Sequence, residues 1–146
     1  QMDPQEIASS PLFGALNEAE LSDVAALMER RGYSAGDVVF HQGDIGDRFF
    51  YVAEGKVQVW LKLPDGGSRE LATLGPGQYF GELALLDDLP RSADVICGEE
   101  SELWSLEREQ FINLLRGNTN LAIKILRVLG RRLRQANRQI QDLSAL

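Results

Sequence analysis

Cysteine and histidine are nearly absent from this chain, and each shortage excludes a class of site. The 146 residues include one cysteine, Cys97, so no disulfide can form within the chain. This is typical of a reducing compartment, and we expect a cytoplasmic location. The one histidine, His41, excludes sites that need two histidine ligands or a cysteine–histidine cluster. Neither a metalloenzyme nor a Ser–His–Asp catalytic set is therefore expected.

Positive charge and long apolar runs are also scarce. The net charge is −7, from 15 basic and 22 acidic residues, which disfavours a globally basic nucleic-acid-binding protein. No apolar run approaches the roughly 18 residues of a membrane-spanning helix. The chain begins Gln-Met-Asp-Pro, unlike a signal peptide, and residues 1–10 are interpreted as a tail or an expression remnant.

The charge that is present is distributed unevenly. Residues 120–146 include six basic residues and one acid, a net charge of +5, whereas the rest of the chain has nine basic and 21 acidic residues, or −12. A charged run of this kind usually forms the solvated face of a helix. We therefore expect a basic C-terminal helix on an acidic body, without direct nucleic-acid contact.

The patterns along the chain follow the order helix, sheet, helix. Asn17 and Glu20 form a capping-box motif that begins a helix predicted over residues 18–30. From residue 32 to residue 81 glycine recurs every few residues between short runs rich in Val, Phe, Tyr and Leu, which is typical of short strands joined by tight turns. Strands are predicted at 38–42, 48–53, 56–63, 70–74, 92–97 and 102–106.

The fold class that follows is α+β and mainly β. Many short antiparallel strands without long helices between them indicate a β-roll, a jelly-roll-like barrel. We expect this roll to span residues 11–118, with an N-terminal helix and a short helix inside it. Two C-terminal helices are predicted over 108–116 and 119–143, and residues 119–146 are interpreted as a lid or dimerisation helix.

Apolar residues in the last helix recur at alternating spacings of three and four. They are Leu126, Leu129, Leu133, Ala136, Ile140 and Leu143. This is a heptad stripe of about two and a half repeats, which favours a homodimer formed by helix pairing. The alternative is that the stripe packs on the chain's own sheet.

The most informative segment for chemistry is 80–93. Gly81 lets the backbone approach a ligand closely, and a short helix just after it would direct free N–H groups toward an anion. Arg91 offers a planar fork suited to phosphate, and Ser92 adds a hydroxyl donor. Glu82 would repel a phosphate unless the ligand also offers hydroxyls, as a ribose does. On spacing alone, a salt bridge between Glu82 and Arg91 is an open alternative.

This segment resembles the phosphate-binding cassette of the cyclic-nucleotide-binding domain family, of the catabolite activator protein and protein kinase A regulatory subunit type. The cassette pattern, Phe-Gly-Glu-(Leu/Ile)-(Ala/Gly)-Leu, then a short insert and Pro-Arg-(Ala/Ser/Thr)-Ala, is matched at every fixed position. The flanking runs 35–47 and 50–57 are similar to the early strands and turns of the family. Residues 11–143 can all be laid on the family pattern without a large gap.

The resemblance implies roles for the cassette residues. Glu82 would accept a hydrogen bond from the ribose 2′-OH. Arg91 would bind the exocyclic oxygens of the cyclic phosphate, helped by Ser92. Backbone N–H groups of Leu83 and Ala84 would complete the cradle beside Gly81.

The resemblance also implies where the sugar and base are contacted. The apolar positions that pack against them match Val59, Leu71 and Leu74. The base-facing part of the last helix in bacterial relatives matches Arg132, Ala136 and Asn137. Some relatives have small hydroxyl residues where this chain has Ala136 and Asn137, so the base contact departs from the pattern. An Asn side chain still offers a donor and an acceptor to a purine edge.

The resemblance therefore implies a regulatory module rather than an enzyme. It would bind a cyclic nucleotide and pass a conformational change through its last helix to an effector domain or a partner subunit. We favour cAMP as the ligand, and cGMP is an alternative because a hydroxyl residue at the position of Ser92 can contact the guanine amino group. Two other interpretations stay open: a dimerisation module without a ligand, and a cupin-like β-barrel enzyme, which the single histidine disfavours.

Overall fold

Two four-stranded antiparallel sheets form the body of the protein. A computed structural model of the chain describes residues 2–144, and the side chains of residues 2–139. The strands are β1 (Glu29–Tyr33), β2 (Val38–Phe40), β3 (Arg48–Glu54), β4 (Val57–Lys62), β5 (Ser68–Leu74), β6 (Tyr79–Phe80), β7 (Asp94–Cys97) and β8 (Ser101–Glu107). One sheet has the order β1-β8-β3-β6 and the other the order β2-β7-β4-β5. The α+β roll that the sequence predicted is confirmed.

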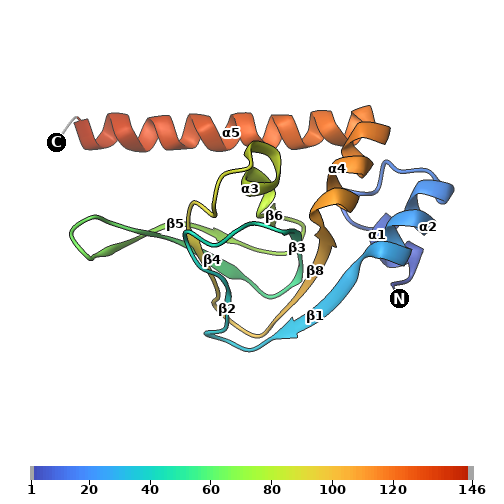
Figure 1. Cartoon of the computed structure of the whole chain (residues 1–146), viewed down its shortest axis with the longest axis horizontal. Coiled ribbons are helices and arrows are strands. Elements are labelled where there is room, and N and C mark those ends of the chain that lie inside the picture. Colours follow the sequence, from blue (N-terminus) through green and yellow to red (C-terminus); the bar gives the residue numbers. More distant parts are fainter. Residues whose placement is uncertain (1, 145–146) are drawn as a thin grey trace.

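Helices precede, interrupt and follow the roll (Figure 1). They are α1 (Pro4–Ala8), α2 (Glu18–Leu27), α3 (Glu82–Asp87), α4 (Arg108–Gly117) and α5 (Thr119–Ser144). The capping box predicted at the start of α2 is present, with both the Asn17 and the Glu20 side chains bonded to backbone N–H groups. No helix in residues 2–144 combines the length and the apolarity that crossing a bilayer requires.

Four elements differ from the sequence prediction. The helix expected to reach residue 30 ends at Leu27, because residues 29–33 leave the helix and pair as β1 with β8. Strand β1 is almost wholly exposed, so no apolar alternation in the sequence marks it. The short α1 and the two-residue β6 were also not predicted. Residues of α1, which lies in the segment interpreted as a tail, enter the core, where Ile7 is fully buried.

The apolar core has two parts. One lies between the two sheets and includes Val52, Val57 and Leu103. The other lies between the β1-containing sheet and the helices, where Phe49 stacks on Phe111 of α4 at a centroid distance of 4.5 Å. The second part anchors the start of α5 to the roll, so the position of the last helix depends on the packing of the body.

Helix α5 extends well beyond the core that anchors it, and it runs along one side of the roll above α3 (Figure 1). Leu121 and Ile125 are buried, whereas Leu126 and Leu133 are 64% and 63% exposed. Leu129 is half-buried against the core. The predicted heptad stripe is therefore divided between the chain's own body and solvent. Its members Ile140 and Leu143 lie outside the residues whose side chains are described.

Candidate functional site

A cavity of about 1020 Å³ lies between the roll, the segment around α3, and α5. Its walls come from β2, β4, β5, β6 and β7, from the first turn of α3 and the residues on either side of that helix, and from one face of α5. A cavity of this size is typical of small-ligand sites. The chain thus places the predicted cassette, the predicted apolar contacts and part of the last helix around one space.

Gly81 is the turn that starts α3 and lets the cassette close on itself. Its φ of 85° lies in the left-handed region that favours glycine. A Cβ at this position would lie 2.9 Å from Nη1 of Arg91 and 3.2 Å from the carbonyl oxygen of Arg48. A side chain here would therefore displace the guanidinium of Arg91.

Arg91 is buried at one end of the cavity, with 5% of its surface exposed. Its Nη1 and Nη2 each donate a 2.7 Å hydrogen bond, to the carbonyl oxygens of Gly81 and Arg48. The guanidinium lies over the ring of Phe40, 4.1 Å from its centroid. Within the described residues, Nε is buried and has no hydrogen-bond partner. A buried unpaired donor is unfavourable by about 1–3 kcal/mol, so this atom indicates a place for an acceptor.

The charge on Arg91 is opposed by burial and supported by its neighbours. Burial lowers the pKa of the Arg91 guanidinium, and the carboxylates of Asp47, Glu82 and Asp44 raise it. The acidic groups thus keep a cation in a largely dehydrated position. A phosphate anion brought to this end of the cavity would meet a preoriented positive charge.

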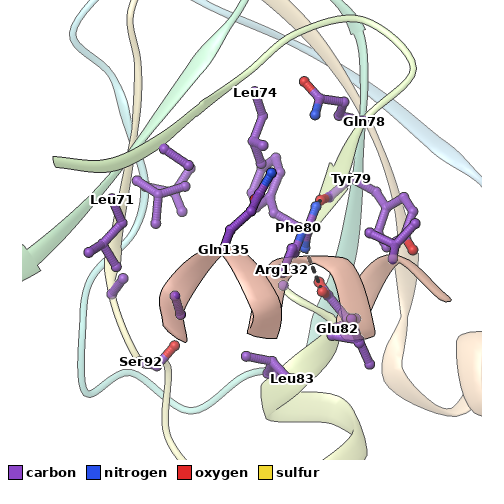
Figure 2. A pocket seen from close by; sticks show the side chains of 18 of the residues that line it. Leu71, Leu74, Gln78, Tyr79, Phe80, Glu82, Leu83, Ser92, Arg132 and Gln135 are labelled. Carbon is purple, nitrogen blue, oxygen red and sulfur yellow. Dashed lines mark hydrogen bonds and ion pairs between the residues drawn. The ribbon is translucent and has the colours of Figure 1, made fainter. Parts of the chain in front are cut away.

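Glu82 is 2% exposed and forms an ion pair with an arginine of α5. Nη1 of Arg132 donates to Oε1 of Glu82 at 2.7 Å, and Nη2 donates to the carbonyl oxygen of Tyr79 at 2.6 Å (Figure 2). Burial raises the pKa of Glu82, and the positive charges of Arg132 and Arg91 oppose that rise. Of the two arginines considered from the sequence, Arg132 is the one that pairs with the carboxylate, and Arg91 instead bonds to backbone carbonyls.

The structure gathers almost all of the predicted site residues around this cavity. The residues that line it and were singled out from the sequence are Val59, Leu71, Leu74, Gly81, Glu82, Leu83, Ala84, Arg91, Ser92, Arg132 and Ala136. Asn137 is not among the lining residues and is exposed on α5.

Several lining residues were not singled out from the sequence. Phe40 and Tyr79 belong to strands beside the cassette, and Gln135 and Gln139 belong to α5. Gln135 follows Arg132 by three residues and Gln139 follows Gln135 by four, so they share one helix face. That spacing is a signal in the sequence that could have identified both glutamines.

The single histidine and the single cysteine lie outside the cavity lining. His41 lies 3.8 Å from a carboxylate oxygen of Asp94, and its side chain is 60% exposed. Cys97 is buried in β7. The described part of the chain contains no group of three or more metal-ligating side chains.

This chain is similar to known proteins both in sequence and in fold. The family profile "Cyclic nucleotide-binding domain" matches residues 30–118. The cyclic AMP receptor protein of Thermus thermophilus is 40% identical over 135 residues, which cover 92% of this chain and 62% of that protein. The crystal structure of the Thermus thermophilus catabolite activator protein matches with a TM-score of 0.81 at 40% identity, covering 92% of this chain and 63% of that one.

A third similar structure comes from Toxoplasma gondii. The regulatory domain of Toxoplasma gondii PKA, crystallised with cAMP, matches with a TM-score of 0.68 at 32% identity, over 76% of this chain and 42% of that one. This chain spans less than two thirds of the length of each of these relatives. The profile match, the identity and the shared fold agree with the cassette, and the chain belongs to the cyclic nucleotide-binding domain family.

Proposed function

We propose that this domain is a sensor that binds cAMP in the cavity beneath α5. The observation that carries the proposal is the buried Arg91, whose Nε has no partner in the described residues and which lines the same cavity as the carboxylate of Glu82. A cyclic nucleotide supplies an acceptor for the arginine, in its phosphate, and a donor for the carboxylate, in its ribose 2′-OH.

The names of the relatives support cAMP rather than cGMP. The Thermus thermophilus relative is named a cyclic AMP receptor protein, and the Toxoplasma gondii domain was crystallised with cAMP. Ser92 also lines the cavity, and its hydroxyl keeps cGMP as the second candidate ligand. An enzymatic activity is not proposed, in agreement with the membership of a sensor-domain family.

Helix α5 is the element through which binding would be transmitted. It lines the cavity with Arg132 and also presents exposed leucines to solvent. A ligand can shift the position of this helix only by its difference in affinity for the two positions, which is about 1–3 kcal/mol in typical allosteric coupling. The receiving element would be an effector domain or a second copy of the chain paired along α5.

Titration calorimetry with cAMP tests the binding site. Arg91→Ala should weaken binding by roughly tenfold to 150-fold per lost bond, because a hydrogen bond to a charged group contributes about 1.5–3 kcal/mol. Arg91→Lys keeps the charge and removes the fork, so it separates charge from geometry. Arg134→Ala removes an arginine that is exposed on α5 and outside the cavity lining, and it serves as the matched control.

Thermal unfolding separates a sensor from a dimerisation module without a ligand. A compound that binds only the folded protein must raise its melting temperature. The wild-type protein should melt at a higher temperature with cAMP, and Arg91→Ala should show a much smaller rise at the same concentration. Equal affinities of wild type and Arg91→Ala would contradict the assignment of the cassette.

A further inference from the structure

We infer that one exposed face of α5 is a docking surface for an acidic segment of a partner protein. This face has a stripe of five basic residues, which we name the basic stripe: Lys124, Arg127, Arg131, Arg134 and Arg138. Among them only Arg131 borders the cavity. The inference therefore goes beyond the proposed function, because most of this surface lies outside the proposed nucleotide site.

The basic stripe runs along one side of the helix. Its members recur at alternating spacings of three and four. At about 100° and 1.5 Å per residue, they lie within an arc of about 80° and span about 21 Å of the axis. Lys124 is half-buried and donates to the carbonyl oxygen of Pro11, whereas the four arginines are exposed. Because α5 lies at the edge of the molecule (Figure 1), a partner could contact these arginines together.

Nothing along the helix balances the charge of the basic stripe. The sequence has no acidic residue between Glu109 and Asp142. Within the residues whose side chains are described, none of Arg127, Arg131 and Arg134 forms an ion pair. Like charges three or four residues apart destabilise a helix, whereas a helix face that is only solvated commonly alternates charges of both signs. An anionic partner would remove this repulsion, so the basic stripe favours a bound state.

A nucleic-acid duplex fits this surface less well than a polypeptide does. The rest of the chain has a net charge of −12, and α5 crosses it above α3 (Figure 1). Asp87 and Asp88, at the end of α3, are exposed. A duplex has one negative charge for about every 1.7 Å of its length and is wider than a single helix. The acidic body would therefore repel it.

An anionic membrane also fits less well, because of where the apolar residues of α5 lie. The exposed Leu126 and Leu133 are centred about 130° around the helix from the basic stripe. A helix that binds a membrane surface buries its apolar face in the lipid and keeps its basic residues at the headgroups. Insertion of the two leucines would turn most of the basic stripe away from the headgroups.

An acidic polypeptide matches the basic stripe in both charge and period. Glutamates that alternate at spacings of three and four on a helix form one row of carboxylates with the same rise as the arginines. A single helix is narrow enough to follow the row without covering the acidic body. Exposed ion pairs contribute little each, and rows of complementary charge chiefly speed association and select the partner. We therefore expect a reversible contact that weakens with salt.

The test is fluorescence anisotropy with a labelled helical peptide, built on alanine, whose glutamates alternate at spacings of three and four. At about 100 mM salt, charges more than about 10 Å apart are largely screened. The peptide should bind wild type, and the double variant Arg127→Glu, Arg134→Glu should bind it about tenfold or more weakly, because each change turns an attraction into a repulsion. The matched control is Arg69→Glu, Arg116→Glu, which makes the same change in net charge at exposed positions outside α5 and should bind like wild type.

A second peptide and two other polyanions test the kind of partner. A peptide of the same composition, with its glutamates dispersed around the helix, should bind more weakly than the first peptide. Equal affinity of the two peptides, an equal loss in both double variants, or no binding by wild type overturns the inference. Tighter binding of a DNA duplex or of vesicles containing phosphatidylserine than of the first peptide also overturns it.

Calorimetry with cAMP and thermal unfolding separate this inference from the proposed function. The double variant Arg127→Glu, Arg134→Glu should keep the wild-type affinity for cAMP, because neither residue lines the cavity. If wild type binds the peptide but not cAMP, the proposed function fails and the inference stands. If the melting temperature shows that this variant is not folded, Arg127→Gln, Arg134→Gln replaces it. That variant should lose affinity for the peptide in the same direction, and an unchanged affinity overturns the inference.

Discussion

Arg132 of α5 donates a 2.7 Å hydrogen bond to Glu82 of α3, so the last helix is tied to the carboxylate on which sugar binding is proposed to depend. The same arginine donates to the carbonyl oxygen of Tyr79. Its Cζ lies 5.2 Å from the centroid of the Tyr79 ring. A ribose hydroxyl that bonds to Glu82 would therefore share the carboxylate with α5. This arrangement gives a direct physical route from the ligand to the position of the helix.

The first prediction concerns the strength of this pair. Arg132→Ala should lower the free energy of unfolding by about 1–3 kcal/mol, because it leaves the carboxylate of Glu82 buried without its partner. The value should lie below the 3–5 kcal/mol typical of fully buried pairs, because the Arg132 side chain is 33% exposed. Urea unfolding of the ligand-free protein measures the change.

A double-mutant cycle isolates the interaction. Arg132→Ala, Glu82→Gln and the double variant should give a coupling free energy of at least about 0.5 kcal/mol, the lower end for residues in direct contact. Arg134→Ala, on the exposed side of the same helix, should leave stability within about 0.5 kcal/mol of wild type. Additive effects of Arg132→Ala and Glu82→Gln would show that the pair does not hold the helix.

The second prediction is a pH dependence of stability that comes from Glu82. Burial raises the pKa of this carboxyl above its ordinary 4.5. Between pH 4.5 and the raised pKa, the folded state therefore binds more protons than the unfolded state. The contribution of Glu82 is therefore fully present below pH 4.5 and is lost as the pH rises through the raised pKa. Wild type should lose stability relative to Glu82→Gln over that range.

Denaturant unfolding of both proteins from pH 4 to pH 8 measures the difference, in which the other carboxylates largely cancel. If wild type instead gains stability relative to Glu82→Gln as the pH rises, the ion pair with Arg132 outweighs burial. The direction assigned to the pKa of Glu82 would then be wrong.

The cassette could be predicted from the sequence because its parts are close together in the chain. Gly81, Glu82 and Arg91 lie within eleven residues, and their order and residue types are specific. The alternation of short strands and glycine turns likewise indicated the roll, and the capping box at Asn17 indicated α2. These features depend on local geometry, which the sequence expresses directly.

The features that were not predicted depend on partners far along the chain. Glu29 pairs with Ser105 in the sheet, which no local pattern near residue 29 announces. Glu82 pairs with Arg132, 50 residues away, although Arg91 is nearer in the sequence. The face of α5 that meets the cavity was predicted only in part, with Arg132 and Ala136 but not the two glutamines, because it depends on how Leu121 and Ile125 seat the helix on the core.

The third prediction concerns Gly46, which faces the cassette from the loop before β3. A Cβ at Gly46 would overlap the Cβ of Ala84 and lie 3.1 Å from Cζ of Arg91. Gly46→Ala should therefore displace the cassette, weaken cAMP binding about tenfold or more and lower stability by about 1–3 kcal/mol. Calorimetry and urea unfolding measure the two effects.

Gly32→Ala is the matched control for Gly46→Ala. Its added Cβ would have no heavy atom within 4 Å, so nucleotide affinity should stay the same. An equal loss of affinity in both variants would point to a general effect on the fold, and normal affinity in Gly46→Ala would show that the cassette tolerates movement at Ala84.

The fourth prediction concerns pairing of α5 with a second copy of the chain. Leu126 and Leu133 are seven residues apart on one helix face and are both about two-thirds exposed. In a two-fold symmetric dimer each residue is used twice, so Leu133→Glu removes two buried leucines, at about 1.5–3 kcal/mol each, and brings two like charges together. The dimer dissociation constant should rise by at least about 100-fold.

Light scattering coupled to size-exclusion chromatography, at tens of micromolar protein, distinguishes the outcomes. Leu89→Glu is the matched control, because Leu89 is 62% exposed, close to the 63% of Leu133, but lies on the cassette side rather than on α5. Wild type and Leu89→Glu should have the mass of a dimer, and Leu133→Glu the mass of a monomer. A dimer that persists in Leu133→Glu would place the contact elsewhere. A monomeric wild type at this concentration would contradict the pairing of α5 with a second copy.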